Sequence, residues 1–301
     1  MSQVVALAVA DIHLRHSCPP ARAAESDWYK AMLRPIEQLR ALVAEYKCPV
    51  ICAGDIFDRW DSPPELINFA IKYLPKMIAI PGQHDLPNHE YGSKHRSAYR
   101  TLELAGILWG GDTGRLLLSR EVSVDKFPWG TSVKSNGFKG DTLINIALIH
   151  SLIWKKGHTY PDAPETSNIK AWMDRLDGYN VAVFGDNHDG FIDTSKGCRI
   201  MNCGCLIRAK SNERDYKPSV GLIYDDGSIT RKHLDTSEDK WIDPEPKKVD
   251  SEVAELKDFL QELHTLGVSK LDFRTAVERY LEKNKVRESV IKILIDSMEG
   301  E

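Results

Sequence analysis

Residues 49–58 read PVICAGDIFD, and this stretch decides how the chain folds. Its first half, PVICA, is a short apolar run rich in β-branched residues, which is typical of a buried strand. The run ends at Gly54-Asp55, and a second carboxylate, Asp58, follows three residues later. The pattern therefore predicts a central strand whose carboxyl end carries acidic side chains.

Four further apolar runs end in the same way, on residue types that can bind metal ions. These runs and the residues after them are 4–10 with Asp11 and His13, 77–81 with Gln83 and His84, 143–149 with His150, and 181–184 with Asp186 and His188. Open α/β sheets bind ligands at the carboxyl ends of their strands. Because five runs share the feature, we predict that the polar residues meet in one site.

The segments around these runs indicate the fold class. Residues 27–46 place apolar side chains on one helical face, and Pro64-Glu65 begins a second helix that runs to about residue 73. Residues 116–124 have the pattern of a strand, and residues 198–201 and 220–224 that of a closing antiparallel pair. The alternation of strands and helices in the first half predicts an α/β fold with parallel strands.

Composition limits the class of protein. With 42% hydrophobic and 28% charged residues, the 301-residue chain resembles an ordinary globular protein. No apolar run approaches the roughly 20 residues that cross a bilayer, and residues 4–10 lack the basic flank of a signal peptide. We therefore expect a cytoplasmic protein with no membrane association and with cysteines that are mostly reduced. Its net charge of −4 gives no general attraction to nucleic acids, so such binding would need local basic patches or metal ions.

The chain divides into two parts by composition. Residues 1–235 carry all of the strand-end motifs and form the predicted catalytic domain. Residues 236–249 are polar, contain Pro244 and Pro246, and are predicted to be a linker. Residues 250–301 have only helical periodicity, which predicts a small C-terminal helical module.

The strand-end residues suit phosphoester chemistry at a pair of metal ions. Two divalent ions about 3.5–4 Å apart can activate a water molecule and neutralise the phosphoryl oxygens. Such a centre needs a carboxylate that bridges the ions and several oxygen and imidazole ligands. Taken singly, each motif is more often a turn, a helix cap or a buried histidine. In this order and at these strand ends, we predict metal binding.

The ordered motifs D-x-H, G-D-x-x-D, G-x-H-D, H and G-x-x-H resemble those of the calcineurin-like metallophosphoesterases, over residues 4 to about 190. The resemblance implies an α/β fold, a metallophosphoesterase-type αββα sandwich, here followed by the small C-terminal helical module. It also implies a first ion with a complete set of standard ligands, which are Asp11, His13, Asp55 and His188. The implied ligands of the second ion are Asp55, as the bridge, Gln83, His150 and Asp186.

The resemblance also implies catalytic roles for two residues. His84 matches a histidine that binds no metal but faces the leaving-group oxygen, and Asp58 matches a carboxylate that orients it. Two positions depart from the family pattern, since the family usually has asparagine at Gln83 and histidine at Asp186. Both lie on the second ion, and their oxygens favour Mn²⁺ or Mg²⁺ over Zn²⁺. The alternative is a second site that holds its ion weakly.

Longer motif strings resemble a narrower group, the SbcD-type nucleases of DNA double-strand-break repair. The strings are GDIFD at 54–58, GQHDLP at 82–87 and the small-residue turn NCGC at 202–205, which Arg208 follows. The resemblance implies that the chain cleaves DNA with two Mn²⁺ ions, or with Mg²⁺. It further implies an SMC-like ATPase partner (SbcC-type) bound by the C-terminal helices, and it allows for a homodimer. Packing of these helices on the catalytic domain is an equal alternative.

Basic residues follow four of the motifs and offer a surface for a phosphate backbone. They include Arg15 and Arg22, Lys94 and Arg96, Lys155 and Lys156, and Arg208 and Lys210. Two other functions remain open. One is a phosphatase or phosphodiesterase of nucleotides or other small phosphoesters, which would use the same metal site. The other is a scaffold that has kept the fold without catalysis.

Overall fold

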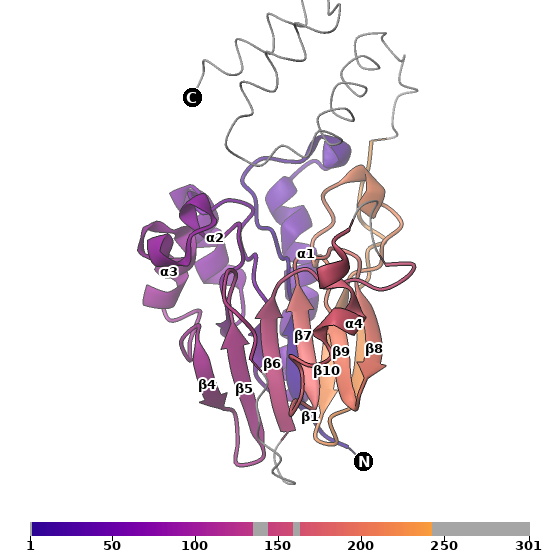
Figure 1. The fold of residues 1–301 in the computed structure, drawn as a ribbon. Helices are drawn as coiled ribbons and strands as arrows, with labels where there is room; N and C mark the ends of the chain where they lie inside the picture. The colour runs from indigo at the N-terminus through magenta and orange to yellow at the C-terminus, as the bar shows by residue number, and fades with distance from the viewer. Residues whose placement is uncertain (1, 135–143, 159–162, 243–301) are drawn as a thin grey trace, which may run out of the picture. The chain divides into compact units, whose positions relative to one another are not determined.

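Two mixed β-sheets pack face to face in the computed structural model, which describes residues 2–134, 144–158 and 163–242 (Figure 1). The first sheet has the order β11-β10-β1-β2-β3. Its strands are β1 (Val4–Val9), β2 (Val50–Cys52), β3 (Met77–Ala79), β10 (Ser219–Tyr224) and β11 (Ile229–His233). The second sheet has the order β4-β5-β6-β7-β9-β8. Its strands are β4 (Gly114–Leu117), β5 (Val122–Phe127), β6 (Ile144–His150), β7 (Val181–Gly185), β8 (Phe191–Ser195) and β9 (Cys198–Asn202).

The strands that carry the motifs are parallel within each sheet. β1 pairs with β2 and β2 with β3, while β6 pairs with β5 and β7. All three residues of β2 are buried, as expected of a central parallel strand with both faces covered. Parallel pairing points the carboxyl ends in one direction, so the polar residues after each strand are brought to one end of the fold.

The two predicted helices, at 27–46 and from Pro64 to about residue 73, form and serve as crossovers, and two further α-helices were not predicted. The α-helices are α1 (Trp28–Tyr46), α2 (Pro64–Tyr73), α3 (Ala98–Leu104) and α4 (Ile169–Trp172). Short 3-10 turns lie at Pro20–Arg22, Pro87–His89, Tyr91–Arg96, Glu165–Ser167 and Ser211–Glu213. The carboxylate of Asp27 accepts a hydrogen bond of 3.1 Å from the Lys30 amide and caps α1. None of the described helices is long and apolar enough to cross a membrane.

The core is layered as an αββα sandwich. Between the sheets lies one apolar cluster, to which Ala8 and Ile51 contribute from the first sheet and Leu148 and Val183 from the second. The outer side of the first sheet packs against α1, α2 and α3, and the outer side of the second against Trp172 of α4. The predicted α/β sandwich is therefore confirmed. The proposed helical module at 250–301 lies outside the described residues.

One predicted strand is wrong in its extent. Residues 116–124 are not a single strand but part of a hairpin, in which β4 pairs antiparallel with β5. The chain turns between them, where Ser119 and Glu121 are exposed. The turn has no glycine or proline, so the residues that usually mark a turn are absent from its sequence.

Residues 236–242, the first half of the predicted linker, contact the body of the fold. Asp239 pairs with Arg22 at 2.9 Å and with Arg208 at 2.8 Å, and both arginines are buried. The ring of Trp241 lies 4.7 Å from the Arg22 guanidinium and 5.3 Å from that of Arg208. These two arginines are therefore internal, and the expectation that they line a phosphate-backbone surface is wrong.

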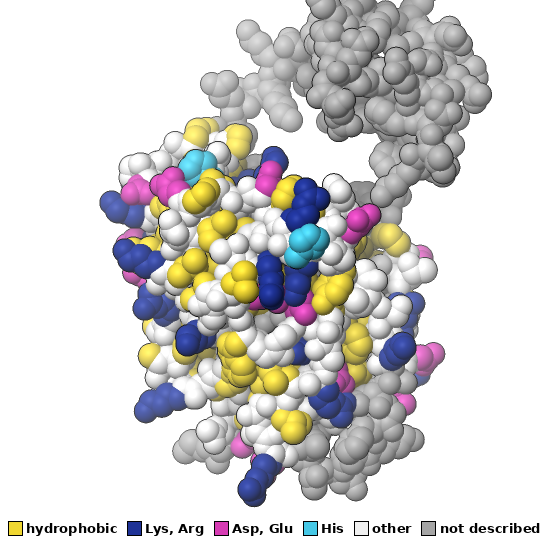
Figure 2. All heavy atoms as spheres, turned by 90° about the vertical axis from the view of Figure 1, so that its left-hand side faces the viewer, with side chains coloured by type: hydrophobic (Ala, Val, Ile, Leu, Met, Phe, Trp, Pro, Cys, Tyr) yellow, Lys and Arg dark blue, Asp and Glu magenta, His cyan; other side chains and the backbone are white. Residues whose placement is uncertain are grey.

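Other basic residues are dispersed over the surface. On the face that carries α2, α3 and β4, Lys and Arg side chains stand singly or in small groups among hydrophobic side chains (Figure 2). Lys94 is held between Glu103, at 2.8 Å, and Asp112. Arg96, Lys156 and Lys210 are exposed. The basic surface is thus smaller than the sequence indicated.

Candidate metal centre

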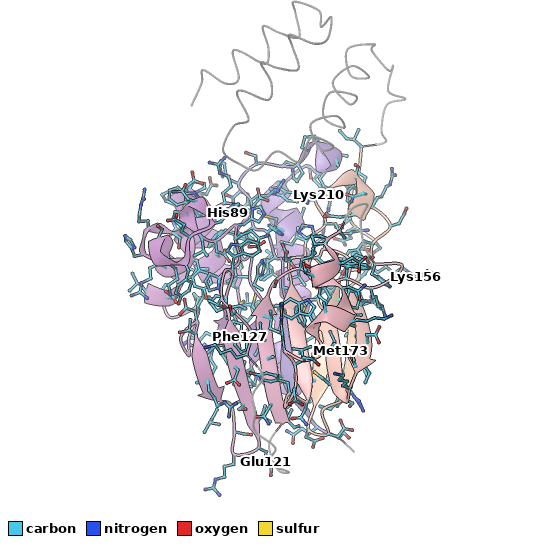
Figure 3. All side chains as sticks on the ribbon, viewed as in Figure 1. His89, Glu121, Phe127, Lys156, Met173 and Lys210 are labelled. Atoms are coloured by element: carbon cyan, nitrogen blue, oxygen red, sulfur yellow. The ribbon has the colours of Figure 1, made fainter. Side chains whose placement is uncertain are left out.

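The predicted ligands gather at the carboxyl ends of the parallel strands. In Figure 3, His89 and Lys210 label this end of the molecule, and Glu121 labels the opposite end. Asp11 and His13 follow β1, and Asp55 follows β2. His150 ends β6, and Asp186 and His188 follow β7.

The first ligand cluster is compact, with Asp11 and His13 buried and His188 partly buried. The Nε2 atoms of His13 and His188 lie 3.0 Å apart, and Asp11 Oδ1 lies 4.0 Å from His13 Nε2. Donor atoms that share one divalent ion lie about 3 Å apart, because metal–ligand bonds are about 2.1 Å long and meet near right angles. The spacing of these side chains therefore fits the first predicted ion.

The second cluster includes both residues that depart from the family pattern. Gln83 Oε1 lies 2.6 Å from His150 Nε2, and Gln83 Nε2 donates a hydrogen bond of 2.6 Å to Asp186 Oδ1. The main-chain amide of Asp186 donates to Asp11, at 3.0 Å. Gln83 and Asp186 thus lie where the second ion would need oxygen ligands.

Asp55 lies between the two clusters. Its Oδ1 accepts a hydrogen bond of 3.0 Å from the His84 amide. Its Oδ2 lies 3.7 Å from His13 Nε2 and 3.6 Å from His150 Nε2. This oxygen is buried and has no hydrogen-bond partner among the described residues. A buried, unpartnered carboxylate oxygen is costly unless a cation binds it, so Asp55 fits the bridging position.

Electrostatics also favour bound cations. Burial is the main cause that raises the pKa of Asp11 well above its usual range, and the neighbouring Asp55 adds to it. Burial likewise raises the pKa of Asp55 to about 7. It lowers the pKa of His13 and of His150, which keeps both rings neutral as metal ligands require. The residues present therefore fit two divalent ions.

The backbone around the ligands is held in uncommon conformations. Asp11 and His13 both have φ of 48°, Asp55 has 52° and Asp186 has 91°. Left-handed backbone at residues other than glycine costs free energy and is concentrated at functional sites. A Cβ atom at Gly82 would lie 2.0 Å from Asp55 Oδ1, so only glycine lets this loop approach the bridging carboxylate.

The model of the calcineurin-like phosphoesterase family matches residues 5–193. The chain belongs to this family. Its members are metal-dependent phosphoesterases with a dimetal centre, and this chain is accordingly a phosphoester hydrolase. None of the curated proteins matches the chain significantly.

Several solved structures are similar to this calcineurin-like phosphoesterase at low sequence identity. A dimetal phosphatase from Danio rerio has 11% identity and a TM-score of 0.50, covering 78% of this chain and 96% of its own. A putative 5'-nucleotidase from Staphylococcus aureus has 13% identity and a TM-score of 0.46, covering 85% of this chain and 58% of its own. A metallophosphoesterase from Sphaerobacter thermophilus has 14% identity and a TM-score of 0.38, covering 78% and 89%.

His84 stands beside the first cluster of the phosphoesterase. Its ring contacts that of His13 edge to face, with the centroids 5.0 Å apart. Its Nδ1 lies 2.9 Å from the main-chain carbonyl of Asp58. The Asp58 carboxylate points elsewhere, to Arg15 and to within 3.7 Å of His13 Nδ1. Asp58 therefore contacts His84 through its carbonyl oxygen, and the orienting role of its carboxylate stays a prediction.

Glu213 is a further residue of the site, beyond those predicted from the sequence. Its carboxylate accepts a hydrogen bond of 2.9 Å from His188 Nδ1 and two more from the amides of Ala209 and Lys210. Burial raises the pKa of Glu213, but these hydrogen bonds outweigh it and lower the pKa overall. A charged carboxylate therefore orients His188, a predicted ligand of the first ion. Glu213 follows no apolar run, so no strand-end signal marks it.

Proposed function

We propose that this phosphoesterase is a Mn²⁺-dependent phosphodiesterase of the SbcD type that cleaves DNA and works with an SMC-like ATPase. The strings at 54–58 and 82–87 support the nuclease group. The observation that carries the hydrolytic part is the unpartnered Oδ2 of Asp55, which lies between His13 and His150. Cleavage of a phosphodiester by two divalent ions would need one cation on each side of this carboxylate, to neutralise the phosphoryl oxygens.

Three histidines of the centre, His84, His150 and His188, are held in defined tautomers. A carbonyl oxygen only accepts, so the Nδ1 atoms of His84 and His150 carry protons that they donate to Asp58 and Ala53. In His188 the same atom donates to Glu213. The Nε2 lone pairs of His150 and His188 are therefore available to hold metal ions.

His84 has a different task because it belongs to neither proposed ligand set. With Nδ1 fixed on the Asp58 carbonyl, a second proton on this ring can only sit at Nε2. We propose that His84 acts as the general acid and donates this proton to the leaving-group oxygen. Two bound divalent ions would activate a water molecule and neutralise the phosphoryl oxygens. Oxygen ligands at Gln83 and Asp186 support Mn²⁺ or Mg²⁺ at the second position.

The test compares substrates at one metal centre. The full chain is given linear DNA, hairpin DNA and bis-p-nitrophenyl phosphate, in Mn²⁺ and in Mg²⁺, with and without an SMC-like ATPase. We expect DNA cleavage that is fastest in Mn²⁺ and stimulated by the ATPase, with two Mn²⁺ bound per chain by calorimetry. Hydrolysis of bis-p-nitrophenyl phosphate without DNA cleavage would refute the nuclease assignment, and one Mn²⁺ at saturation would refute the second ion.

A second candidate is the hydrolysis of nucleotides or other small phosphoesters. It is favoured by the internal ion pairs of Arg22, Arg208 and Lys94, which leave fewer basic side chains for a long phosphate backbone. The same substrate comparison decides between the two. A non-catalytic scaffold is disfavoured because the ligand clusters and His84 are all in place.

A further inference from the structure

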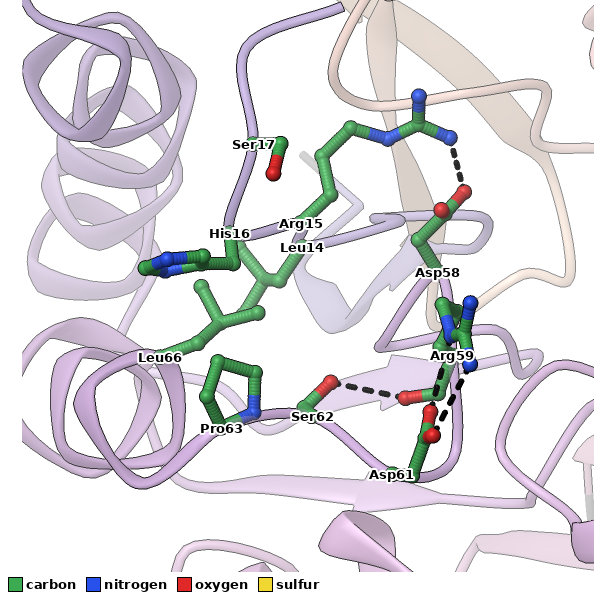
Figure 4. A pocket seen from close by; sticks show the side chains of 10 residues that line it. All are labelled: Leu14, Arg15, His16, Ser17, Asp58, Arg59, Asp61, Ser62, Pro63 and Leu66. Carbon is green, nitrogen blue, oxygen red and sulfur yellow. Dashed lines mark hydrogen bonds and ion pairs between the residues drawn. The ribbon is translucent and has the colours of Figure 1, made fainter.

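Two arginines stand on loops that carry or contact residues of the first ligand cluster, and the fold uses them differently. Arg15 is partly exposed and lines a surface pocket, where its guanidinium is directed to the Asp58 carboxylate (Figure 4). Arg208 is buried, and its guanidinium contacts main-chain oxygens of the β9–β10 loop, residues 203–218. Arg15 therefore pairs with a side chain near the surface, whereas Arg208 holds a segment of backbone.

The β9–β10 loop packs directly on the first cluster. The Cys205 amide donates a hydrogen bond of 3.2 Å to the His188 carbonyl, and the Leu206 amide donates one of 3.1 Å to the Asp11 carbonyl. Further along the loop, the Glu213 carboxylate accepts a hydrogen bond of 2.9 Å from His188 Nδ1. One loop therefore contacts two predicted ligands of the first ion, Asp11 through its backbone and His188 through both backbone and ring.

Arg208 closes the turn of this loop that carries Glu213. Its Nη1 donates hydrogen bonds to the carbonyl of Arg214 and, at 3.2 Å, to that of Tyr216. Glu213 closes the same turn from inside, because its Oε2 accepts from the amides of the two residues after Arg208, at 2.7 and 2.9 Å. Its other oxygen, Oε1, is the one on His188. The position of Oε1 therefore depends on a turn that Arg208 holds at both ends.

The direction of the Arg208 guanidinium is fixed by acceptors beyond the loop. Asp239 Oδ2 accepts from its Nε at 3.1 Å and from its Nη2 at 2.8 Å, and the Thr236 carbonyl accepts from Nη2 at 3.3 Å. Arg22 Nη1 donates a hydrogen bond of 2.6 Å to the Arg208 carbonyl. A guanidinium holds its five N–H donors in one plane, so these acceptors orient the whole group. A lysine at this position would keep the charge and lose the planar fork.

We propose that Arg208 is a positioning residue of the first metal site, which acts through Glu213 on His188. The turn that Arg208 closes keeps the Glu213 carboxylate where it orients the His188 ring, and a carboxylate so placed strengthens a histidine as a metal ligand. The inference rests on the metal centre of the proposed function and adds that residues behind the ligands help to set its affinity. It applies to DNA and to small phosphoesters as substrates.

The test uses Arg208→Lys, which keeps a positive charge beside Asp239 and removes the fork. Arg34→Lys is the matched control, because Arg34 donates to Asp239 at 3.0 Å in the same ion-pair network but has Glu25 as its other partner, at 2.6 Å. Both exchanges are made in the unmodified chain and in Glu213→Gln. Calorimetry measures the affinity of each Mn²⁺ site, and thermal unfolding measures Tm. Hydrolysis of bis-p-nitrophenyl phosphate is followed against Mn²⁺ concentration.

We expect Arg208→Lys to weaken one Mn²⁺ site about threefold to tenfold, less than the 10–100-fold typical of losing the partner of a ligating histidine itself. It should be the site that Glu213→Gln weakens, with the other site unchanged. Saturating Mn²⁺ should restore kcat, which a loosened fold would not allow. In the Glu213→Gln background the exchange should alter affinity by less than about twofold, because the two residues act in series. Arg34→Lys should leave both affinities unchanged.

Two results would overturn the inference. A lower Tm with both Mn²⁺ affinities unchanged in Arg208→Lys would make Arg208 a residue of the fold alone. An equal loss of affinity with and without the Glu213 carboxylate would show that Arg208 does not act through it. If Arg208→Lys does not fold, Asp239→Asn carries the same test, since it releases the guanidinium while Arg22 keeps its ion pair with Glu25.

The proposed function fails in a different way. An unmodified enzyme that binds two Mn²⁺ and hydrolyses bis-p-nitrophenyl phosphate without cleaving DNA refutes the nuclease assignment and leaves the role of Arg208 standing. One Mn²⁺ at saturation refutes the second ion, and the affinity of the remaining site in Arg208→Lys still decides the inference.

Discussion

The Nδ1 atom of His84 is held by a main-chain carbonyl and not by a carboxylate. A carbonyl fixes the tautomer without adding a full negative charge next to the ring. The ring is thus oriented by the backbone of the loop after β2, which also carries Asp55, the predicted bridging ligand. Small shifts of this loop would move the acid and the ligand together.

His84→Ala should lower kcat for phosphodiester cleavage by about 10²–10⁴-fold, the usual contribution of a general acid. Metal affinity should be unchanged, because His84 belongs to neither ligand cluster. The measurements are steady-state kinetics and Mn²⁺ calorimetry on the same preparations. His89→Ala is the matched control, since His89 is exposed and its ring centroid lies 6.4 Å from that of His84. Parallel loss of metal binding and cleavage in His84→Ala would make it a ligand instead.

Glu213→Gln should weaken binding of the first ion about 10–100-fold, because a carboxylate behind a ligating histidine raises the basicity of the ring. The variant keeps the shape of the side chain and removes its charge. Calorimetry should show the loss in one of two Mn²⁺ sites. Glu165→Gln, an exposed exchange of the same kind, should have no effect. Unchanged affinity in Glu213→Gln would limit Glu213 to a structural role.

At the scale of elements, the strands that carry the site were predictable and the connections were not. β2 and β7 are buried on both faces, so they appear in the sequence as continuous apolar runs that end at polar residues. Their parallel pairing then places the ligands together. Glu213 and the Arg15–Asp58 pair join segments far apart in the chain through irregular loops, for which periodicity gives no signal.

The core between the sheets should be more sensitive than the helical surface. Ile51 of β2 is fully buried in the inter-sheet cluster, so Ile51→Ala should lower the free energy of unfolding by about 2–5 kcal/mol. Ile67 of α2 is only partly buried, and Ile67→Ala should cost less. Urea denaturation of both variants measures the difference. Equal losses would contradict the two-sheet packing as the main core.

For the whole molecule, the buried carboxyl groups predict how stability depends on pH. Burial raises the pKa values of Asp55 and Asp85 to about 7. A carboxyl group whose folded-state pKa exceeds its unfolded value, about 4, binds protons more tightly when folded, so the metal-free protein loses stability as the pH rises from about 4 to about 7. A cation bound at Asp55 would replace the proton of that carboxyl group.

The Tm of metal-free protein should therefore fall between about pH 5 and pH 8, and added Mn²⁺ should raise Tm more at the higher pH. Thermal unfolding with and without EDTA measures both effects. Asp55→Asn should reduce the pH dependence, whereas Asp174→Asn, on the exposed surface, should keep it. A Tm gain from Mn²⁺ that is the same at both pH values would contradict the link between these carboxyl groups and the ions.

The contacts of Asp239 and Trp241 predict where the catalytic domain ends more closely than composition does. A chain that ends at residue 235 loses the carboxylate that pairs with the buried Arg208, and an uncompensated buried charge costs about 3–5 kcal/mol, whereas Arg22 keeps its ion pair with Glu25. A chain that ends at residue 242 keeps these contacts and the hydrogen bond from the Ile242 amide to the Ala21 carbonyl.

We therefore expect the chain ending at 242 to retain the Tm and the bis-p-nitrophenyl phosphate hydrolysis of the full chain, and the chain ending at 235 to unfold at markedly lower temperature. If residues 250–301 bind the SMC-like ATPase, the chain ending at 242 should also fail to retain that partner in a pull-down. Retention of the partner would move the docking surface onto the catalytic domain. A large loss of Tm in the chain ending at 242 would instead support packing of the C-terminal residues on that domain, because removing a docking module leaves the core and the Arg22–Asp239 network intact.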